Sequence, residues 1–333
     1  MRIAFFEIEE WERKLLETSL AGHQLSFHEK PLTPATAKEA ADAEAVSVFV
    51  YSHVNKETLD ALPKVKFVTT RSMGFDHIDL AACKERGVAV ARVPAYGDRT
   101  VAEHAFALIL ALSRKIFLAY ERTEKGIFDY HGLQGFDLYR KTLGVVGGGK
   151  IGMNVARIAK GFEMDVLVSD PFPKQELADS IGFRYAPLDE LLARADVVTL
   201  HAPYMPQTHH LMNAEKFAKM KRGAVLVNTA RGALIDTQAL LKALEDGILA
   251  GAGLDVLEEE TFIKEECELM GKDFSKKCDL AAVVRNHMLI ARNDVIITPH
   301  IGFNSREAME RIVATTVENV NGFAAGAPVN LVP

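Results

Sequence analysis

The sequence of 333 residues has few cysteines, and none of them forms a C-x-x-C pair. The three are Cys83, Cys267 and Cys278, an odd number at wide spacings. Disulfide-rich scaffolds and structural zinc sites need paired or clustered cysteines, so this pattern excludes both. Such cysteine usage is typical of a reducing compartment, and we therefore expect a cytoplasmic protein.

Long apolar runs and an excess of basic residues are also missing. No apolar stretch reaches the roughly 20 residues that span a membrane. The first residues, MRIAFFEIEEW, carry acids early and lack the layout of a signal peptide. Lysine and arginine number 39 against 45 aspartates and glutamates, a net charge of −6, whereas nucleic-acid-binding proteins usually present a basic face. We therefore expect neither a membrane protein nor a DNA- or RNA-binding protein.

Short β-branched segments alternate with amphipathic segments of helical length, which is typical of parallel sheets in α/β proteins. The length exceeds that of one typical core and predicts two domains. A first set of strands is expected near 2–6, 25–28, 45–50, 66–70 and 88–93. The strands of a second set are expected to end near Val146, Ser169, Leu200, Asn228, Asp255 and Thr298. The predicted fold is α/β, with two Rossmann or flavodoxin-like domains built on parallel sheets.

The last helical segment, within 305–326, has no strand of the second set to pair with, so we expect it to return to the first domain. The predicted domains are therefore 1–97 with 302–333, and 98–301. A long apolar segment over 100–122 predicts one continuous helix that runs between them.

The stretch VVGGGKIG, at 145–152, follows an apolar strand and opens an amphipathic helix. Its glycines occupy the three positions of a dinucleotide-binding turn: Gly147 for the tight turn, Gly149 for close approach of a pyrophosphate, and Gly152 for helix packing. Lys150 and Ile151 begin the helix. The next strand ends at Asp170, where a carboxylate accepts the ribose hydroxyl and repels a 2′-phosphate. A glycine turn without ligand is the alternative, but strand, helix and acid are all in place, which favours NAD.

The other strand ends of the second domain are polar. In an open parallel sheet, ligands bind outside the carboxyl ends of the strands, and these ends carry His201-Ala202-Pro203, Thr229-Ala230-Arg231, Asp255 and His300. The planar fork of Arg231 suits a carboxylate, although a structural salt bridge is the alternative. A histidine such as His300, paired with a carboxylate beside a nicotinamide, is what carbonyl reduction needs as proton donor. Physical reasoning does not choose a partner among the three glutamates at 258–260.

Seven segments together carry a family resemblance: RSMGFDHIDL, VPAYGDRTVAEHAFALILAL, LGVVGGGKIG, HAPYMPQTHHLMN, NTARGALID, GLDVLEEE and TPHIGF. Because these segments occur in this order, the chain resembles the D-isomer-specific 2-hydroxyacid dehydrogenases over essentially its whole length. Within the family it is most similar to the D-lactate dehydrogenase branch, because of PAY before the long helix, DVLEEE, and a phenylalanine at 303. The resemblance implies an NAD-dependent oxidoreductase that converts pyruvate and NADH to D-lactate and NAD, in an active-site cleft between two domains.

The resemblance also implies roles for single residues. Arg231 would bind the substrate carboxylate and carbonyl, His300 would be the acid–base residue, and Glu260, five residues after Asp255, would be its partner. The backbone around Met73 and Gly74 would hold the carboxylate, and Tyr96, Phe303 and the loop at 51–53, which begins with Tyr51, would line the pocket. The expected cofactor-binding residues are Gly147, Gly149, Lys150, Ile151, Gly152, Asp170, His201, Ala202, Pro203, Thr229, Ala230 and Asp255.

Family members form a homodimer through the NAD-binding domain, so the same assembly is expected here. His209 and His210 lack a third ligand at a suitable spacing, so no metal is expected. Gly302 stands where this branch often has alanine, and the segment 261–294 has no readable conformation. Alternatives with the same residues are a 2-hydroxyisocaproate or phenyllactate dehydrogenase, a glyoxylate reductase, and a non-catalytic NAD-sensing protein.

Overall fold

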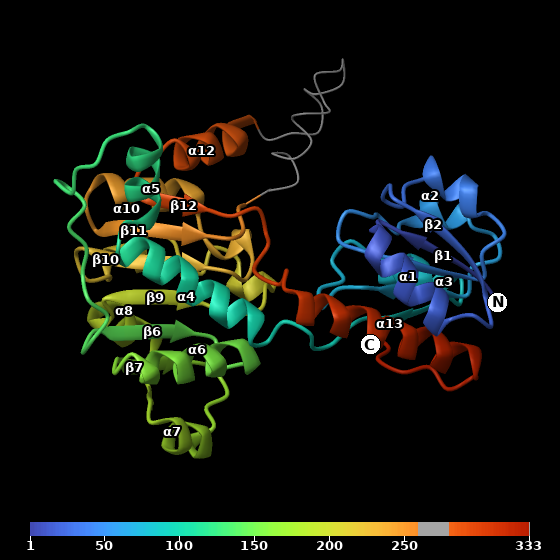
Figure 1. Ribbon diagram of the computed structural model, residues 1–333. Helices are drawn as coiled ribbons and strands as arrows, with labels where there is room; N and C mark the ends of the chain where they lie inside the picture. The colour runs from blue at the N-terminus through green and yellow to red at the C-terminus, as the bar shows by residue number, and fades with distance from the viewer. Residues whose placement is uncertain (259–279, 333) are drawn as a thin grey trace. The chain divides into compact units, whose positions relative to one another are not determined.

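The chain folds into two compact units, Met1–Tyr96 with Asn304–Pro333, and Gly97–Phe303 (Figure 1). The structure is a computed structural model that describes residues 1–258 and 280–332. The chain crosses between the units after Tyr96 and again after Phe303, where the sequence predicts crossings after residues 97 and 301. Each unit has its own sheet and its own apolar core.

The first unit is built on a parallel sheet with the strand order β2-β1-β3-β4-β5. This order places a topological switch point between β1 and β3, whose connections leave on opposite sides. The strands are β1 (Arg2–Phe6), β2 (Gln24–His28), β3 (Ala45–Val48), β4 (Phe67–Thr70) and β5 (Ala89–Ala91).

Helices cover both faces of the first sheet, so its central strands are apolar on both sides. On one face, α1 (Glu10–Ser19) and α13 (Arg306–Ala324) pack on Ile3, Phe5 and Phe67. On the other face lie α2 (Lys56–Asp60), α3 (Leu80–Glu85) and the 3₁₀ helix η1 (Thr36–Ala40). The ring of Phe67 stacks on Phe323 with the centroids 4.4 Å apart, which ties the end of α13 to the sheet.

The second unit has a parallel sheet of seven described strands in the order β12-β11-β10-β9-β6-β7-β8, with the switch point between β6 and β9. Six strand ends lie within one residue of the sequence prediction. The prediction missed β8, because two residues are too few to show an alternating pattern. The strands are β6 (Thr142–Val146), β7 (Asp165–Ser169), β8 (Arg184–Tyr185), β9 (Val197–Leu200), β10 (Ala224–Asn228), β11 (Leu249–Leu254) and β12 (Val295–Ile297).

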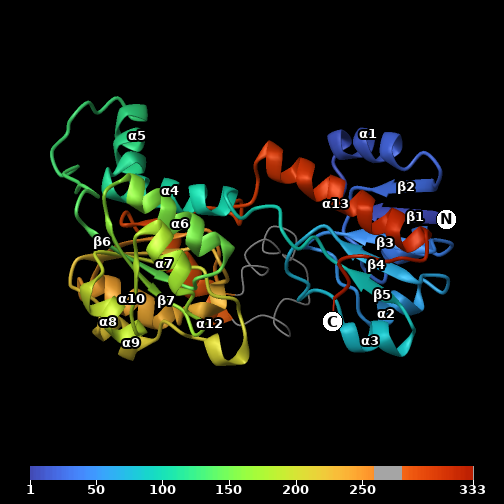
Figure 2. The same cartoon turned by 90° about the horizontal axis from the view of Figure 1, so that it is seen from below.

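Helices also cover both faces of this sheet, with α4, α6 and α7 on one face and α8, α9, α10 and α12 on the other (Figure 2). Their bounds are α4 (Thr100–Ser113), α6 (Lys150–Gly161), α7 (Gln175–Ile181), α8 (Leu188–Arg194), α9 (Ala214–Ala218), α10 (Thr237–Glu245) and α12 (Leu280–Ile290); two 3₁₀ turns are η2 (Pro206–Thr208) and η3 (Gly232–Leu234). None of the described helices combines the length and the apolar character that crossing a membrane requires.

The single helix expected over 100–122 is wrong, because the chain forms two helices, α4 and α5 (Ile116–Glu124). Between them Lys115 adopts a left-handed conformation with φ 51°. The carbonyl oxygen of Ser113 accepts a hydrogen bond from Phe136 N–H, and a Cβ on Gly135 would lie 1.9 Å from the same oxygen. A distant segment therefore packs against the end of α4 and stops the helix.

We predict that Phe67→Ala destabilises the first unit by about 3–5 kcal/mol, because it removes a fully buried ring and its stacking contact with Phe323. Trp11, the single tryptophan of the chain, packs against the same cluster, so its fluorescence during urea unfolding reports on this unit. The control Phe172→Ala removes a ring that is 80% exposed and is expected to change stability by less than about 0.5 kcal/mol. Equal effects of the two substitutions would contradict the packing described.

Candidate active site

The glycine turn lies at the switch point of the second sheet, between the end of β6 and the start of α6. Gly147 has φ 103°, and a Cβ there would lie 2.6 Å from Ala202 N. A Cβ on Gly152 would lie 2.0 Å from the Gly147 carbonyl oxygen. At Gly149, the N-cap of α6, a Cβ would meet nothing within 4 Å. Two of the glycines are therefore required by packing, and the third faces open space in front of the free N–H groups of a helix, which fits a pyrophosphate.

Asp170 follows β7 directly and contacts this turn. Its Oδ2 accepts a hydrogen bond from Gly148 N–H at 2.6 Å, and its Oδ1 accepts one from Phe172 N–H at 2.8 Å. Each carboxylate oxygen has two lone pairs, so both oxygens retain the capacity to accept a ribose hydroxyl. Lys150 and Ile151 begin α6, and the Lys150 ammonium lies 3.8 Å from Asp98 with its side chain 72% exposed.

His201, Ala202 and Pro203 follow β9, on the other side of the switch point. His201 is half-buried with its Nδ1 atom inside the protein, and burial lowers the pKa of its imidazole to about 3, so the ring is neutral. Its Nε2 lies 2.9 Å from Thr199 Oγ1, whereas its buried Nδ1 has no partner among the described residues, and neither has the buried hydroxyl of Thr229. Buried polar atoms are nearly always hydrogen-bonded, so these two atoms fit a bound dinucleotide beside the glycine turn.

Arg231 follows β10 in a turn that the Asn228 side chain holds. Asn228 donates from Nδ2 to the Arg231 carbonyl at 2.9 Å and accepts from Ala230 N–H at 3.0 Å. The guanidinium of Arg231 donates to the Ala230 carbonyl at 2.7 Å. A Cβ on Gly232 would lie 2.0 Å from the Leu257 carbonyl, so this turn packs directly against the segment that follows β11.

Asp255, at the end of β11, holds the loop that carries His300. Its carboxylate accepts hydrogen bonds from Thr298 Oγ1 at 2.6 Å, Ile301 N–H at 2.9 Å and Gly302 N–H at 2.8 Å. The backbone N–H of His300 donates to the Asp255 carbonyl at 2.9 Å, and His300 is left-handed with φ 53°. Burial opposes ionisation of Asp255, but hydrogen bonds from His104, Thr298 and the two N–H groups hold the pKa of this carboxyl below its usual range.

His104, on α4, completes this arrangement and was not identified from the sequence. Its Nε2 lies 3.0 Å from Thr298 Oγ1 and 3.3 Å from Asp255 Oδ1. Gly302 is needed here, because a Cβ would lie 2.8 Å from Asp255 Oδ2 and 3.3 Å from His104 Cδ2. One sequence signal for His104 is a polar residue on an otherwise strongly apolar helix.

The carboxylate of Glu258 is engaged elsewhere. It accepts from His210 Nε2 at 2.6 Å and from Thr237 Oγ1 at 2.8 Å, so it holds the segment after β11 to neighbouring turns. His209 stacks on His210 with the ring centroids 3.9 Å apart. Glu260, the expected partner of His300, lies outside the described residues.

The expected substrate-binding residues fall in both units. Met73 and Gly74 follow β4 in the first unit, where the Met73 carbonyl accepts from Arg92 at 3.2 Å and the Gly74 carbonyl from Ser72 Oγ at 2.6 Å. Tyr96 is also in the first unit and accepts from Arg311 through its carbonyl at 2.8 Å. Phe303 belongs to the second unit, where its ring lies edge-on to His300 at 6.4 Å.

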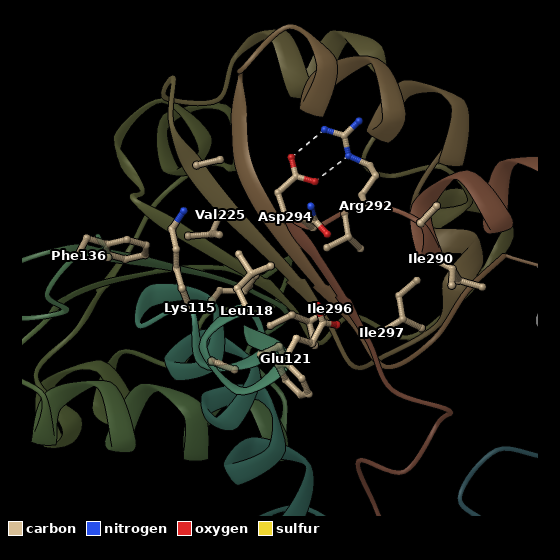
Figure 3. A pocket seen from close by; sticks show the side chains of 18 of the residues that line it. Lys115, Leu118, Glu121, Phe136, Val225, Ile290, Arg292, Asp294, Ile296 and Ile297 are labelled. Atoms are coloured by element: carbon tan, nitrogen blue, oxygen red, sulfur yellow. Dashed lines mark hydrogen bonds and ion pairs between the residues drawn. The ribbon is translucent and has the colours of Figure 1, made fainter. Parts of the chain in front are cut away.

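A hollow of about 900 Å³ lies elsewhere on the second unit (Figure 3). Lys115, which precedes α5, and Leu118 and Glu121 of α5 face Ile290 and the β12 segment across it. Arg292 forms a bidentate ion pair with Asp294 at 2.7 Å. The hollow lies near the amino ends of β10, β11 and β12, because Val225, Ala250 and Val295 at these ends line it. Ligands of parallel sheets bind at the opposite, carboxyl ends, where the glycine turn, Arg231 and His300 are found, so size does not make this hollow the active site.

Comparison with known proteins identifies the family. Residues 106–302 match the D-isomer specific 2-hydroxyacid dehydrogenase family, NAD binding domain. The chain belongs to this family. It is 39% identical to the D-lactate dehydrogenase of Escherichia coli (strain K12) over 330 residues, which cover 98% of each protein. It is 35% identical to the glyoxylate reductase of Korarchaeum cryptofilum (strain OPF8) over 296 residues, 87% of this chain and 83% of the relative.

A solved structure gives the same result. The D-lactate dehydrogenase of Aquifex aeolicus, complexed with NAD and lactic acid, superposes with a TM-score of 0.85 at 37% identity, covering 98% of this chain and 96% of the other. The protein is thus an NAD-dependent D-2-hydroxyacid dehydrogenase, as the motif resemblance predicted, and the second unit contains its NAD-binding domain.

We predict that Thr298→Val lowers kcat about tenfold and leaves NADH affinity nearly unchanged. The change removes the hydroxyl that joins Asp255 to His104 and leaves a buried charge with one donor fewer, a loss of about 1–3 kcal/mol. Steady-state kinetics and NADH fluorescence titration measure the two quantities. Thr316→Val, a buried threonine whose hydroxyl bonds the Ile312 carbonyl within α13, is the control with unchanged kcat. An unaltered kcat in Thr298→Val would rule out the role given to this hydroxyl.

Proposed function

We propose that the protein is a D-lactate dehydrogenase that reduces pyruvate to D-lactate with NADH. The observation that carries this proposal is the placement of Arg231 and His300. Both follow the carboxyl ends of strands of the second sheet, β10 and β12, which lie on either side of β11, on the edge that also carries the glycine turn. This position supports a role for Arg231 as the carboxylate-binding fork and for His300 as the proton donor.

The chain's own residues orient the substrate and move the proton. Arg231 binds the substrate carboxylate with its planar fork. The imidazolium of His300 donates a proton to the carbonyl oxygen. Glu260, proposed from its spacing to Asp255, favours that imidazolium as a nearby anion. NADH supplies the hydride that reduces the carbonyl carbon.

The cofactor-binding roles expected from the sequence are likewise proposals. Gly147, Gly149, Gly152, Lys150 and Ile151 would hold the pyrophosphate at the start of α6, and Asp170 would accept the ribose hydroxyl and disfavour NADPH. Segments after β9, β10 and β11 would lie along the dinucleotide, namely His201, Ala202, Pro203, Thr229, Ala230 and Asp255. The unpartnered buried atoms of His201 and Thr229 support this placement.

The residues proposed to bind the substrate come from both units. Within the described part of the chain, the N–H groups of Met73 and Gly74 donate to no protein acceptor, which suits them to a substrate carboxylate. By the family resemblance, Tyr96, Phe303 and Tyr51 would line the side-chain pocket, and their aromatic rings would restrict its space to a group as small as a methyl. One methylene of the substrate changes the free energy of transition-state binding by only about 1–3 kcal/mol in an apolar pocket, so the preference for pyruvate need not be large.

Glyoxylate reduction is the second candidate, since one relative is a glyoxylate reductase. The same Arg231 and His300 serve either substrate, because both substrates carry a carboxylate next to a carbonyl. A 2-hydroxyisocaproate-type enzyme would differ from a D-lactate dehydrogenase in the size of its substrate pocket. A non-catalytic NAD-sensing protein would differ in having no turnover.

We predict that kcat/KM is highest for pyruvate among pyruvate, 2-ketobutyrate, 2-ketoisocaproate, phenylpyruvate and glyoxylate, measured by loss of NADH absorbance. Arg231→Lys is expected to lower kcat/KM at least about a hundredfold, because an ammonium lacks the bidentate fork. Arg194→Lys, at an exposed position of α8 where Arg194 pairs with Glu190, is the matched control and should leave kcat/KM unchanged. A maximum at glyoxylate or 2-ketoisocaproate would assign another branch of the family, and absence of turnover with all five would favour the sensing protein.

We also propose a homodimer formed through the second unit. Helix α5 buries none of its residues, and the segment after it exposes large rings, with Phe128 96% and Tyr130 79% exposed. The hollow beside α5 is lined by Phe117 and Leu118 together with charged side chains such as Lys115 and Glu121. A two-fold contact uses the same patch on both copies, so a second chain would cover both the exposed rings and the hollow.

The dimer proposal predicts that Phe128→Asp yields a monomer in analytical ultracentrifugation at micromolar concentration. A charge in a desolvated contact is unfavourable, and interfaces of standard size bury about 1,200–2,000 Å². Leu15→Asp, on the exposed face of α1 in the first unit, is the matched control and should leave the dimer intact. A parent protein that sediments as a monomer would overturn the proposal.

A cytoplasmic location is proposed as well. Cys83 is a buried free thiol, and burial raises its pKa to about 11, so it stays protonated and unreactive. A cysteine that is free rather than disulfide-bonded is typical of a reducing compartment, and this supports the proposal.

A further inference from the structure

The switch point of the first sheet holds a carboxylate from the chain itself. Glu7 follows β1, and the segment 49–52 follows β3, the neighbouring strand across the switch point. Glu7 Oε2 accepts from Phe49 N–H at 2.9 Å and Oε1 accepts from Tyr51 N–H at 2.8 Å. The hydroxyl of Ser52 also donates to Oε2. Converging backbone N–H groups form an anion-binding concavity, and here its anion is a side chain.

Arg71 holds Glu7 in the conformation that this contact needs. Glu7 is left-handed, with φ 56°, which is unfavourable for a residue with a Cβ. The guanidinium of Arg71, whose side chain is 1% exposed, donates to the Phe6 carbonyl at 2.8 Å and to the Glu7 carbonyl at 2.7 Å. A further donation goes to Ser47 Oγ at 3.2 Å. The backbone turn after β1 is therefore fixed from inside the unit.

The charge of Arg71 is balanced by Glu12 on α1, with Nε 3.4 Å from Oε1. Burial lowers the pKa of Arg71 and raises the pKa of Glu12, so ionising this pair inside the unit is costly. Replacing a buried ion pair by apolar residues is often neutral or stabilising, so such a pair is weak evidence for stability and better evidence for positioning. Arg71 stands directly before Ser72, Met73 and Gly74, so one guanidinium links the turn that presents Glu7 to the proposed carboxylate-binding segment.

Strands β3 and β4 pair in register up to Val48 and Thr70, and the Arg71 guanidinium lies over the Phe49 ring at 5.6 Å, so the segment 49–52 lies beside the proposed carboxylate-binding segment. We infer that Glu7 is a specificity-positioning residue: its carboxylate, held through Arg71, fixes the segment 49–52, whose Tyr51 is proposed to line the substrate side-chain pocket, and thereby keeps that pocket small. This inference rests on the proposed function of the enzyme, because it concerns which 2-keto acid is preferred. Glu7 acts through the segment after β3, and Arg231 and His300 remain the groups that touch the substrate.

Glu7→Gln tests the inference, because it keeps the shape of the side chain and removes its charge. Glu7→Gly is the second variant: glycine adopts the left-handed conformation without penalty, so the unit keeps its backbone while the carboxylate is lost. Glu44→Gln is the matched control. Glu44 also accepts a backbone N–H, that of Arg2 at 2.8 Å, but at the amino ends of the same two strands.

Two measurements are made on the full-length protein. Amide hydrogen exchange by NMR or mass spectrometry follows the N–H groups of Phe49 and Tyr51. Steady-state kinetics give the ratio of kcat/KM for pyruvate to kcat/KM for 2-ketoisocaproate. In Glu7→Gln and Glu7→Gly we expect exchange about tenfold faster or more, because charge-assisted hydrogen bonds are lost, and a ratio at least about fivefold lower, mainly through a higher KM for pyruvate. Glu44→Gln should change neither quantity.

Faster exchange with an unchanged ratio would show that Glu7 is only a structural cap, and unchanged exchange would show that its carboxylate does not hold the segment; either result overturns the inference. A parent enzyme that prefers another 2-keto acid would overturn the proposed substrate instead. The inference is then decided by whether the ratio between the preferred acid and a longer one shifts in the Glu7 variants and not in Glu44→Gln.

Discussion

The arrangement of the active site depends on the hydrogen bonds between Asp255 and the loop at 298–302. The buried carboxylate of Asp255 accepts hydrogen bonds from the Thr298 hydroxyl and from two backbone N–H groups. The main-chain carbonyl of Asp255 accepts a further one from the backbone N–H of His300. These bonds join β11, β12 and, through His104, α4. They compensate the cost of burying the charge and hold His300 in a left-handed conformation that its side chain disfavours. They thereby fix the backbone from which the imidazole extends.

The two sheets use the same topological feature in opposite ways. In the second unit the switch point between β6 and β9 is left open: Gly149 has empty space where a Cβ would be, and buried atoms of His201, and of Thr229 after the adjacent strand β10, have no hydrogen-bond partner among the described residues. In the first unit the corresponding crevice is closed by Glu7, which satisfies the local N–H groups. A phosphate would meet free donors in one unit and a fixed negative charge in the other. This difference agrees with the NAD-binding domain lying in the second unit.

Three acidic residues near the site illustrate how environment divides their tasks. Asp170 accepts two backbone N–H groups and keeps lone pairs for a ligand. Asp255 is occupied by the His300 loop. Glu258 is occupied by His210 and Thr237, which removes it from the candidates for the partner of His300. Residue type alone does not separate these tasks, because each depends on which donors the fold brings within hydrogen-bonding distance.

The sequence by itself determined the parallel α/β class, most strand ends, the glycine turn with Asp170, and the candidates Arg231 and His300. These follow from short-range chemistry: apolar periodicity, the backbone freedom of glycine, and the rule that strand ends carry ligands. Only the tertiary structure decided the break between α4 and α5, where Phe136 N–H bonds the Ser113 carbonyl, and the His104 contact with a loop 194 residues away. It also decided the pairing of Glu7 with residues more than 40 positions distant. Such contacts have no local pattern, because they arise when strands far apart in the chain become neighbours and bring their ends to one edge of a sheet.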